Sequence, residues 1–220
     1  MSDRPRYNIN ELESFTIDLT SPETGWNALQ QRCSTLSEWG VTTLRDGLDG
    51  YVQCIVLEPY YTCKDHRNLY SNFYSKKFLE VSSNCCRLHF FSRPDVAPKD
   101  LLANEEKYRD HYIGFSVIRP VNIRCLGRTV IDPYKIGKGL KEGYYLLRTA
   151  FKVRINGTLF EVLGYPFTAQ DADATLCAHS ALWGVCRYFS ERYTHYKELF
   201  PFDFIRMTEN SKAERFLTGE

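Results

Sequence analysis

Short runs of apolar, β-branched and aromatic residues recur along the chain and predict a series of β-strands. Three such runs cover residues 51–57, 86–91 and 112–118, and Pro120 ends the third. A fourth strand is predicted over 126–131, where Pro133 ends the pattern because proline cannot donate a ladder hydrogen bond.

The strongest local signal is Asn156-Gly157, which lies between two β-type segments, 144–155 and 158–163. A two-residue type I′ turn needs positive φ at both positions, and Asn-Gly is the pair that most readily adopts it. The segments are therefore predicted to form an antiparallel hairpin. Residues 112–163 as a whole are interpreted as one run of antiparallel strands.

Helices are predicted on both sides of these strands. Ser21 followed by Pro22 is typical of a helix start, and this helix is expected to continue to about Gly40. Further helices are predicted through Leu69–Phe78 and over 98–108, 175–193 and 207–218. The fold class is therefore α+β: an antiparallel sheet of about five strands with helices packed on it. We divide the chain into an α/β domain, 1–165, and a loop with a helical tail, 166–220.

Composition narrows the classes of function. The 220 residues are 43% apolar and 15% aromatic, which is enough for a packed core. Basic and acidic residues nearly balance at 28 and 27, so we expect no nucleic-acid partner. No apolar run is long enough to span a membrane, and residues 1–10 lack the apolar core of a signal peptide. A cytoplasmic location is expected.

The eight cysteines are expected to be free thiols, since no secretion signal is present. The chain has no CxxC pair, and Cys85 and Cys86 are adjacent, so on a strand they point to opposite faces. Neither a metal site nor any other cofactor is therefore predicted.

One cysteine stands apart from the others. Ala178, Leu182, Val185 and Phe189 form an apolar stripe on the predicted helix, and Cys177 lies off that stripe at its N-terminal end. The positive end of the helix dipole favours the reactive thiolate there. Gln170, seven residues earlier in a loop, can place its side-chain NH₂ beside the sulfur, where it would stabilise an oxyanion.

This arrangement of Gln170, a loop, and then Cys177-Ala-His-Ser-Ala-Leu-Trp opening a helix resembles the nucleophile segment of papain-like cysteine peptidases. It is most similar to the branch that includes the bacteriocin-leader peptidases. Segments 51–91 and 114–129 also resemble an uncharacterised group of bacterial proteins. The resemblance implies that Cys177 is the nucleophile, that Gln170 is the oxyanion-hole donor, and that the substrate is a protein or peptide.

The resemblance leaves the catalytic base unassigned. Papain-like enzymes carry a histidine on a strand that follows the nucleophile helix, but here only His179 and His195 follow Cys177. His179 is about 200° around the helix from Cys177 and so faces away, and His195 lies at or past the helix end. His89, upstream on a strand, is predicted to be a core histidine.

The favoured function is a cysteine peptidase or isopeptidase that acts through an acyl-enzyme at Cys177. The alternative is a catalytically inactive papain-like module that binds a protein partner, and a third possibility is acyl transfer. We further expect that the chain is either the N-terminal part of a longer one or lacks the histidine base that papain-like enzymes use. In the first case, the helix that carries Cys177 should expose an apolar face. The sequence leaves the oligomeric state open.

Overall fold

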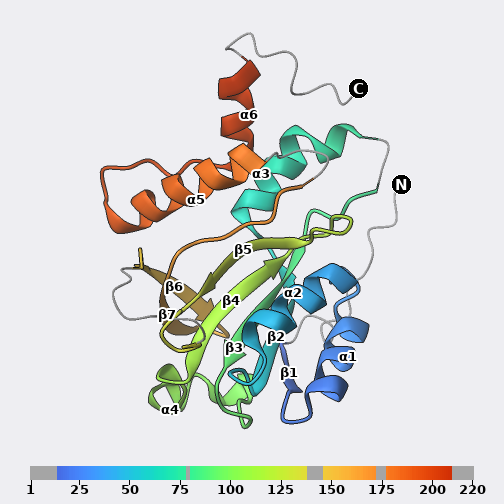
Figure 1. Ribbon diagram of the computed structural model, residues 1–220, viewed down its shortest axis with the longest axis vertical. Helices are drawn as coiled ribbons and strands as arrows, with labels where there is room; N and C mark the ends of the chain where they lie inside the picture. The colour runs from blue at the N-terminus through green and yellow to red at the C-terminus, as the bar shows by residue number, and fades with distance from the viewer. Residues whose placement is uncertain (1–13, 78–79, 138–145, 172–176, 210–220) are drawn as a thin grey trace.

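A computed structural model describes residues 14–77, 80–137, 146–171 and 177–209 (Figure 1). At its centre is an antiparallel sheet with the strand order β1-β2-β3-β4-β5. In chain order these strands are β1 (Phe15–Asp18), β2 (Cys54–Tyr61), β3 (Cys85–Phe91), β4 (Tyr112–Ile118) and β5 (Leu126–Ile131). The predicted α+β class with a five-stranded antiparallel sheet is confirmed. The pattern did not predict β1, which has only four residues.

The predicted hairpin is confirmed in β6 (Thr149–Ile155) and β7 (Thr158–Gly164), with Ile155 opposite Thr158. Both turn residues have positive φ, 45° at Asn156 and 88° at Gly157. The predicted run of antiparallel strands over 112–163 is confirmed in β4, β5, β6 and β7, although β6 and β7 form a separate two-stranded sheet. The predicted strand start at 144 lies outside the described residues.

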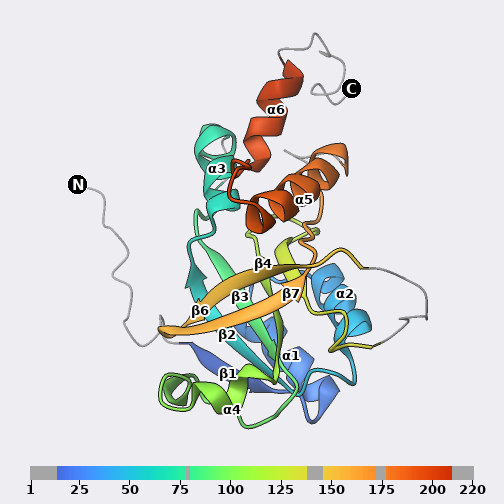
Figure 2. The same cartoon turned by 90° about the vertical axis from the view of Figure 1, so that its left-hand side faces the viewer.

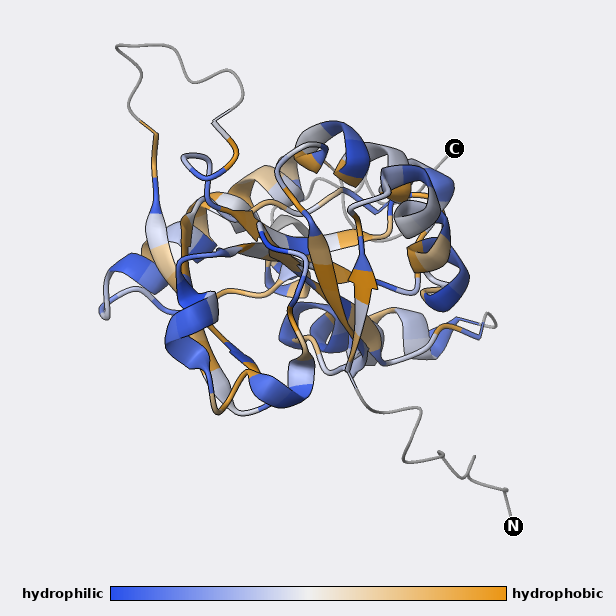
Figure 3. Ribbon diagram, turned by 90° about the horizontal axis from the view of Figure 1, so that it is seen from below, coloured by the Kyte–Doolittle hydropathy of each residue, from blue (hydrophilic) through white to orange (hydrophobic). Residues whose placement is uncertain are grey.

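The hairpin packs face to face on the main sheet (Figure 2). Every second residue of β6 and β7 is buried, so each strand turns one face to the sheet and the other to solvent. Phe160 packs against Phe91 and Tyr112 at ring-centroid distances of 5.8 and 5.0 Å. Apolar residues accordingly concentrate in the central strands, coloured orange in Figure 3.

Helices α1 (Pro22–Arg32) and α2 (Glu38–Leu48) cover the opposite face of the sheet (Figure 1). The predicted single helix ending near Gly40 is wrong, because the Ser37 side chain caps a new helix by accepting a hydrogen bond from the Gly40 N–H. Gly40 is required for close packing instead. A Cβ at this position would lie 2.7 Å from the Cys125 sulfur.

Three helices gather at one end of the sheet: α3 (Lys64–Asn72), α5 (Cys177–Arg192) and α6 (Pro201–Glu209) (Figures 1 and 2). A 3₁₀ turn over Tyr74–Lys76 follows α3. The helix predicted over 98–108 is instead a 3₁₀ turn, Pro98–Asp100, followed by α4 (Glu105–Arg109). The last helix begins before its predicted start at 207, and residues 210–218 of that prediction lie outside the described part.

No described helix is both long and apolar enough to cross a membrane.

Candidate functional site

Cys177 is the first described residue of α5, which has 16 described residues, and its side chain is exposed, as predicted. Each of the other seven cysteines is buried or half-buried. The N-terminus of an α-helix carries unpaired N–H groups and a partial positive charge. Cys177 is thus the thiol that a substrate can reach, and it lies where an anionic sulfur or oxyanion would be stabilised.

The buried face of α5 differs from the predicted one. Leu182 and Val185 are 51% and 44% exposed. The helix buries His179, Trp183 and Arg187 instead, at positions i, i+4 and i+8. The predicted stripe of Ala178, Leu182, Val185 and Phe189 is therefore not the core-facing side.

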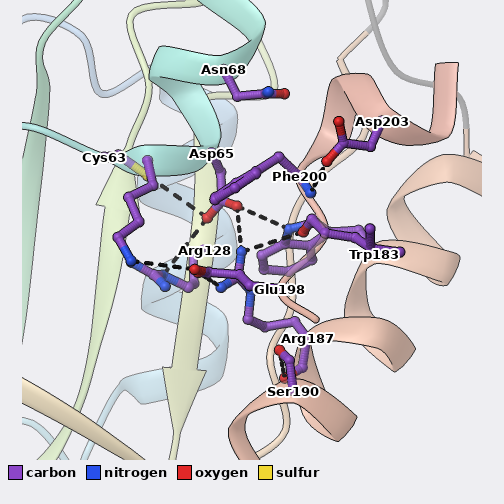
Figure 4. Close-up of polar contacts among 12 residues, drawn as sticks. Cys63, Asp65, Asn68, Arg128, Trp183, Arg187, Ser190, Glu198, Phe200 and Asp203 are labelled. Carbon is purple, nitrogen blue, oxygen red and sulfur yellow. Dashed lines mark hydrogen bonds and ion pairs between the residues drawn. The ribbon is translucent and has the colours of Figure 1, made fainter. Parts of the chain in front are cut away.

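A buried ionic cluster explains why α5 faces inward in this way (Figure 4). Asp65 on α3 accepts hydrogen bonds on Oδ1 from Arg187 at 2.8 Å and from the Trp183 indole N–H at 3.1 Å. The Arg187 side chain is 0% exposed and also pairs with Glu198. A buried cation needs such partners, since an unpaired charge in the interior costs several kcal/mol.

The same carboxylate reaches back to the central sheet. Asp65 Oδ2 lies 3.9 Å from Arg128 Nε on β5 and 3.9 Å from the Cys63 thiol, which donates to it (Figure 4). Asp65 therefore connects α3, α5 and β5. Sequence reasoning missed this residue because its partner Arg187 is 122 positions away. The spacing of His179, Trp183 and Arg187 is the one signal in the sequence that could have indicated the buried face.

Gln170 lies in an extended segment, residues 165–170, which we call the strap. Phe167 exchanges both backbone hydrogen bonds with Thr129 of β5, at 2.8 and 2.9 Å. The Ala169 N–H donates to Leu126 O at 2.9 Å, and the buried Arg119 guanidinium donates to Ala169 O at 2.9 Å. These bonds hold the strap beside α5 and fix the backbone next to Gln170.

The strap and α5 enclose a cavity of about 520 Å³, and both predicted site residues, Cys177 and Gln170, line it. Small residues on α5, Ala181 and Gly184, form part of its wall. Gly184 lets the strap approach α5 closely, because a Cβ there would lie 3.2 Å from the Pro166 carbonyl oxygen, a tight contact. Arg124 and Trp39 complete the opposite side, and of these two sequence reasoning did not identify Trp39.

All five histidines lie among the described residues, and none of them lines the Cys177 cavity. His179 is only 6% exposed and faces the interior, as its position on the helix predicted. His195 is exposed and follows the end of α5. The described residues therefore bring together the predicted nucleophile and the predicted oxyanion donor without a histidine base.

His89 is a core histidine, as predicted, with an exposed fraction of 0%. Its Nδ1 lies 2.9 Å from the Tyr112 hydroxyl, and its Nε2 lies 3.0 Å from Glu58. Burial lowers the pKa of His89 to about 4, although the hydrogen bond to Glu58 opposes this shift. Burial would raise the pKa of Glu58, but hydrogen bonds from His89 and Arg87 outweigh it and lower that pKa to about 2. The pair is thus a neutral imidazole that donates to a carboxylate.

No three His, Cys, Asp or Glu side chains within the described ranges converge so as to hold a metal ion. In comparisons with known proteins, no family model, curated protein or solved structure matches the chain.

Proposed function

We propose that the protein is a cysteine peptidase or isopeptidase-type hydrolase that acts at Cys177. The observation that carries the proposal is that Cys177 and Gln170 line one cavity of about 520 Å³, with the thiol exposed at a helix N-terminus. Thiol peptidases need an accessible sulfur beside donors for an oxyanion. The apolar lining, which includes Phe167 and Val185, suits a peptide better than a small charged metabolite.

In this proposal the Cys177 thiolate attacks the carbonyl carbon of an amide bond. The side-chain NH₂ of Gln170 and the Cys177 N–H donate to the oxyanion that forms. The C–N bond breaks, the leaving amine takes a proton, and the acyl group stays on sulfur as a thioester. Water then attacks the thioester, which releases a carboxylic acid and regenerates the thiol. The proposal assigns the base to none of the histidines, because no histidine lines the cavity.

The experiment uses electrophilic peptide probes, peptidyl vinyl sulfones, with intact-mass and peptide-mapping readout. We expect one adduct, on Cys177, which is abolished in Cys177→Ala and retained in Cys186→Ala. Cys186 is a matched control because it is a half-buried thiol on the same helix. An adduct that forms equally on other cysteines would contradict the proposal.

A Gln170→Ala variant tests the oxyanion role separately. Loss of one oxyanion donor should lower hydrolysis of peptide thioesters and amides by about 10²–10³-fold. Alkylation of Cys177 by iodoacetamide forms no oxyanion, so its rate should stay within about twofold of wild type. Equal losses in both assays would show that Gln170 only shapes the cavity.

A second candidate is an inactive papain-like module that binds a protein partner. The absence of a histidine from the lining of the Cys177 cavity, among the described residues, favours it. It predicts that no probe reacts selectively with Cys177 and that Cys177→Ala binds the partner as well as wild type does.

A further inference from the structure

The Cys177 cavity continues into a second one. A neighbouring cavity of about 350 Å³ shares Tyr165 and Val185 with it and extends to Arg192. Together the two cavities form a cleft along one face of α5, from its first residue, Cys177, to its last, Arg192. These 15 steps span about 22 Å, given the rise of an α-helix, roughly 1.5 Å per residue. An extended peptide covers that length with about six or seven residues at roughly 3.3 Å each.

The strap offers this cleft a free backbone donor. Because Phe167 bonds to β5 through both its N–H and its C=O, the N–H and C=O of its neighbours point to the opposite side. The Pro166 carbonyl oxygen does face α5 at Gly184. Within the described residues the Thr168 N–H donates to no acceptor, although Thr168 lines the cavity. A short strand edge with an unpaired N–H is the feature that extended peptides bind by strand addition.

The described charged side chains that line the cleft are all positive. Arg124 lines the cavity near Cys177, Arg192 lines the second cavity, and no carboxylate lines either one in the part of the chain that the structure describes. The acceptors of the Arg192 guanidinium are neutral: the Tyr188 hydroxyl at 2.6 Å and the Arg148 carbonyl at 3.4 Å. Arg192 also lies over the rings of Tyr188 and Tyr193, at 5.7 and 5.5 Å. The cleft is therefore aromatic and positive.

From these observations we infer that the cleft binds an extended, acidic peptide segment of a partner protein. The segment lies along the strap, pairs with the Thr168 N–H, places a bulky apolar side chain against Tyr188 and Phe189, and presents carboxylates to Arg192 and Arg124. The inference deepens the proposed function, on which it rests, because it names the class of peptide that brings a bond to Cys177. Shape and charge complementarity of this kind determine specificity and on-rate.

Binding is measured on the Cys177→Ala protein, so that no turnover interferes. The probes are fluorescein-labelled octapeptides: one with glutamates around a central phenylalanine, one with lysines in their place, and one with alanine for phenylalanine. We expect fluorescence polarisation to give at least about tenfold tighter binding of the acidic phenylalanine peptide than of the other two. Added salt should weaken that binding, because it screens exposed charges.

Two matched pairs of variants locate the binding site. Val185→Glu should weaken binding about tenfold or more, whereas Leu182→Glu should leave it within about twofold. Both residues are exposed on α5, but only Val185 lines the cleft. Arg192→Glu should weaken binding of the acidic peptide about threefold to tenfold, whereas Arg45→Glu, an exposed charge on α2, should have no effect.

The outcomes separate this inference from the proposed function. If vinyl sulfones label Cys177 but acidic and lysine peptides bind equally, the inference is wrong and the proposed function stands. If the acidic peptide binds as expected but no probe labels Cys177, the proposed function fails and the cleft remains a binding site. If light scattering shows a dimer that Val185→Glu dissociates, a second copy covers the cleft and the inference is overturned.

Discussion

Removal of the Asp65 carboxylate should destabilise the protein and loosen α5. In Asp65→Ala the buried Arg187 loses its 2.8 Å partner and the Trp183 N–H loses its acceptor. A charge-assisted hydrogen bond contributes about 1.5–3 kcal/mol, and an unsatisfied buried donor costs about 1–3 kcal/mol. Glu198 still pairs with Arg187, so we expect a loss of about 3–5 kcal/mol in the free energy of unfolding, the range for breaking a buried ion pair.

Three further variants identify the cause of the loss. Asp65→Asn keeps an acceptor but not the charge and should cost about half as much, since charge-assisted bonds are roughly twice as strong as neutral ones. Lys64→Ala breaks the neighbouring ion pair to Glu198, but Lys64 is 68% exposed, so the cost should stay below about 1 kcal/mol. Asp65→Leu combined with Arg187→Met removes both buried charges and should cost less than the sum of the two single changes.

Urea unfolding followed by circular dichroism gives these free energies, with the slope of each transition checked for two-state behaviour. The iodoacetamide alkylation rate of Cys177 under native conditions reports whether the start of α5 is disturbed as well. Equal costs for Asp65→Ala and Lys64→Ala, within about 0.5 kcal/mol, would refute the view that the buried pair anchors α5.

The remaining predictions concern the hairpin and the buried histidine. Gly157→Val should lower the free energy of unfolding by about 1 kcal/mol or more, because a β-branched residue is strained at φ 88°. An unchanged midpoint of thermal unfolding would contradict the role of the turn. Because the pKa of His89 is lowered from 6.5 to about 4, the unfolded chain binds a proton in that window and the native protein does not. Stability should therefore fall as the pH drops from 6.5 to 4, by about 3 kcal/mol at most. His89→Gln should flatten that dependence in urea titrations, and His195→Gln should not.

Features that depend on neighbouring residues could be predicted from the sequence. Asn156-Gly157 determines its turn by φ alone, and Ser21-Pro22 determines a helix start, so both predictions were confirmed. Cys177 was predicted at the N-terminal end of a helix for the same local reason, and it is the first described residue of α5.

Features that depend on distant partners were predicted wrongly or not at all. The inward face of α5 is determined by Asp65, more than a hundred residues earlier, and this overrides the apolar stripe that includes Leu182. Gly40 is read from sequence as a helix end, yet it is a helix-interior position fitted against Cys125. The β6–β7 hairpin has an alternating pattern that suits either an extra strand of the main sheet or a second layer. Only packing decides between these.

The two walls of the Cys177 cleft are held by different sets of contacts, both of which reach β5. Hydrogen bonds to β5 and Arg119 hold the strap, whereas the Asp65 cluster on α3 holds α5. The distance between the nucleophile and the oxyanion donor is therefore determined by the packing of the sheet and α3, outside the cleft itself. A substitution that shifts α3 would change the width of the cleft although every residue that lines the cleft stays the same.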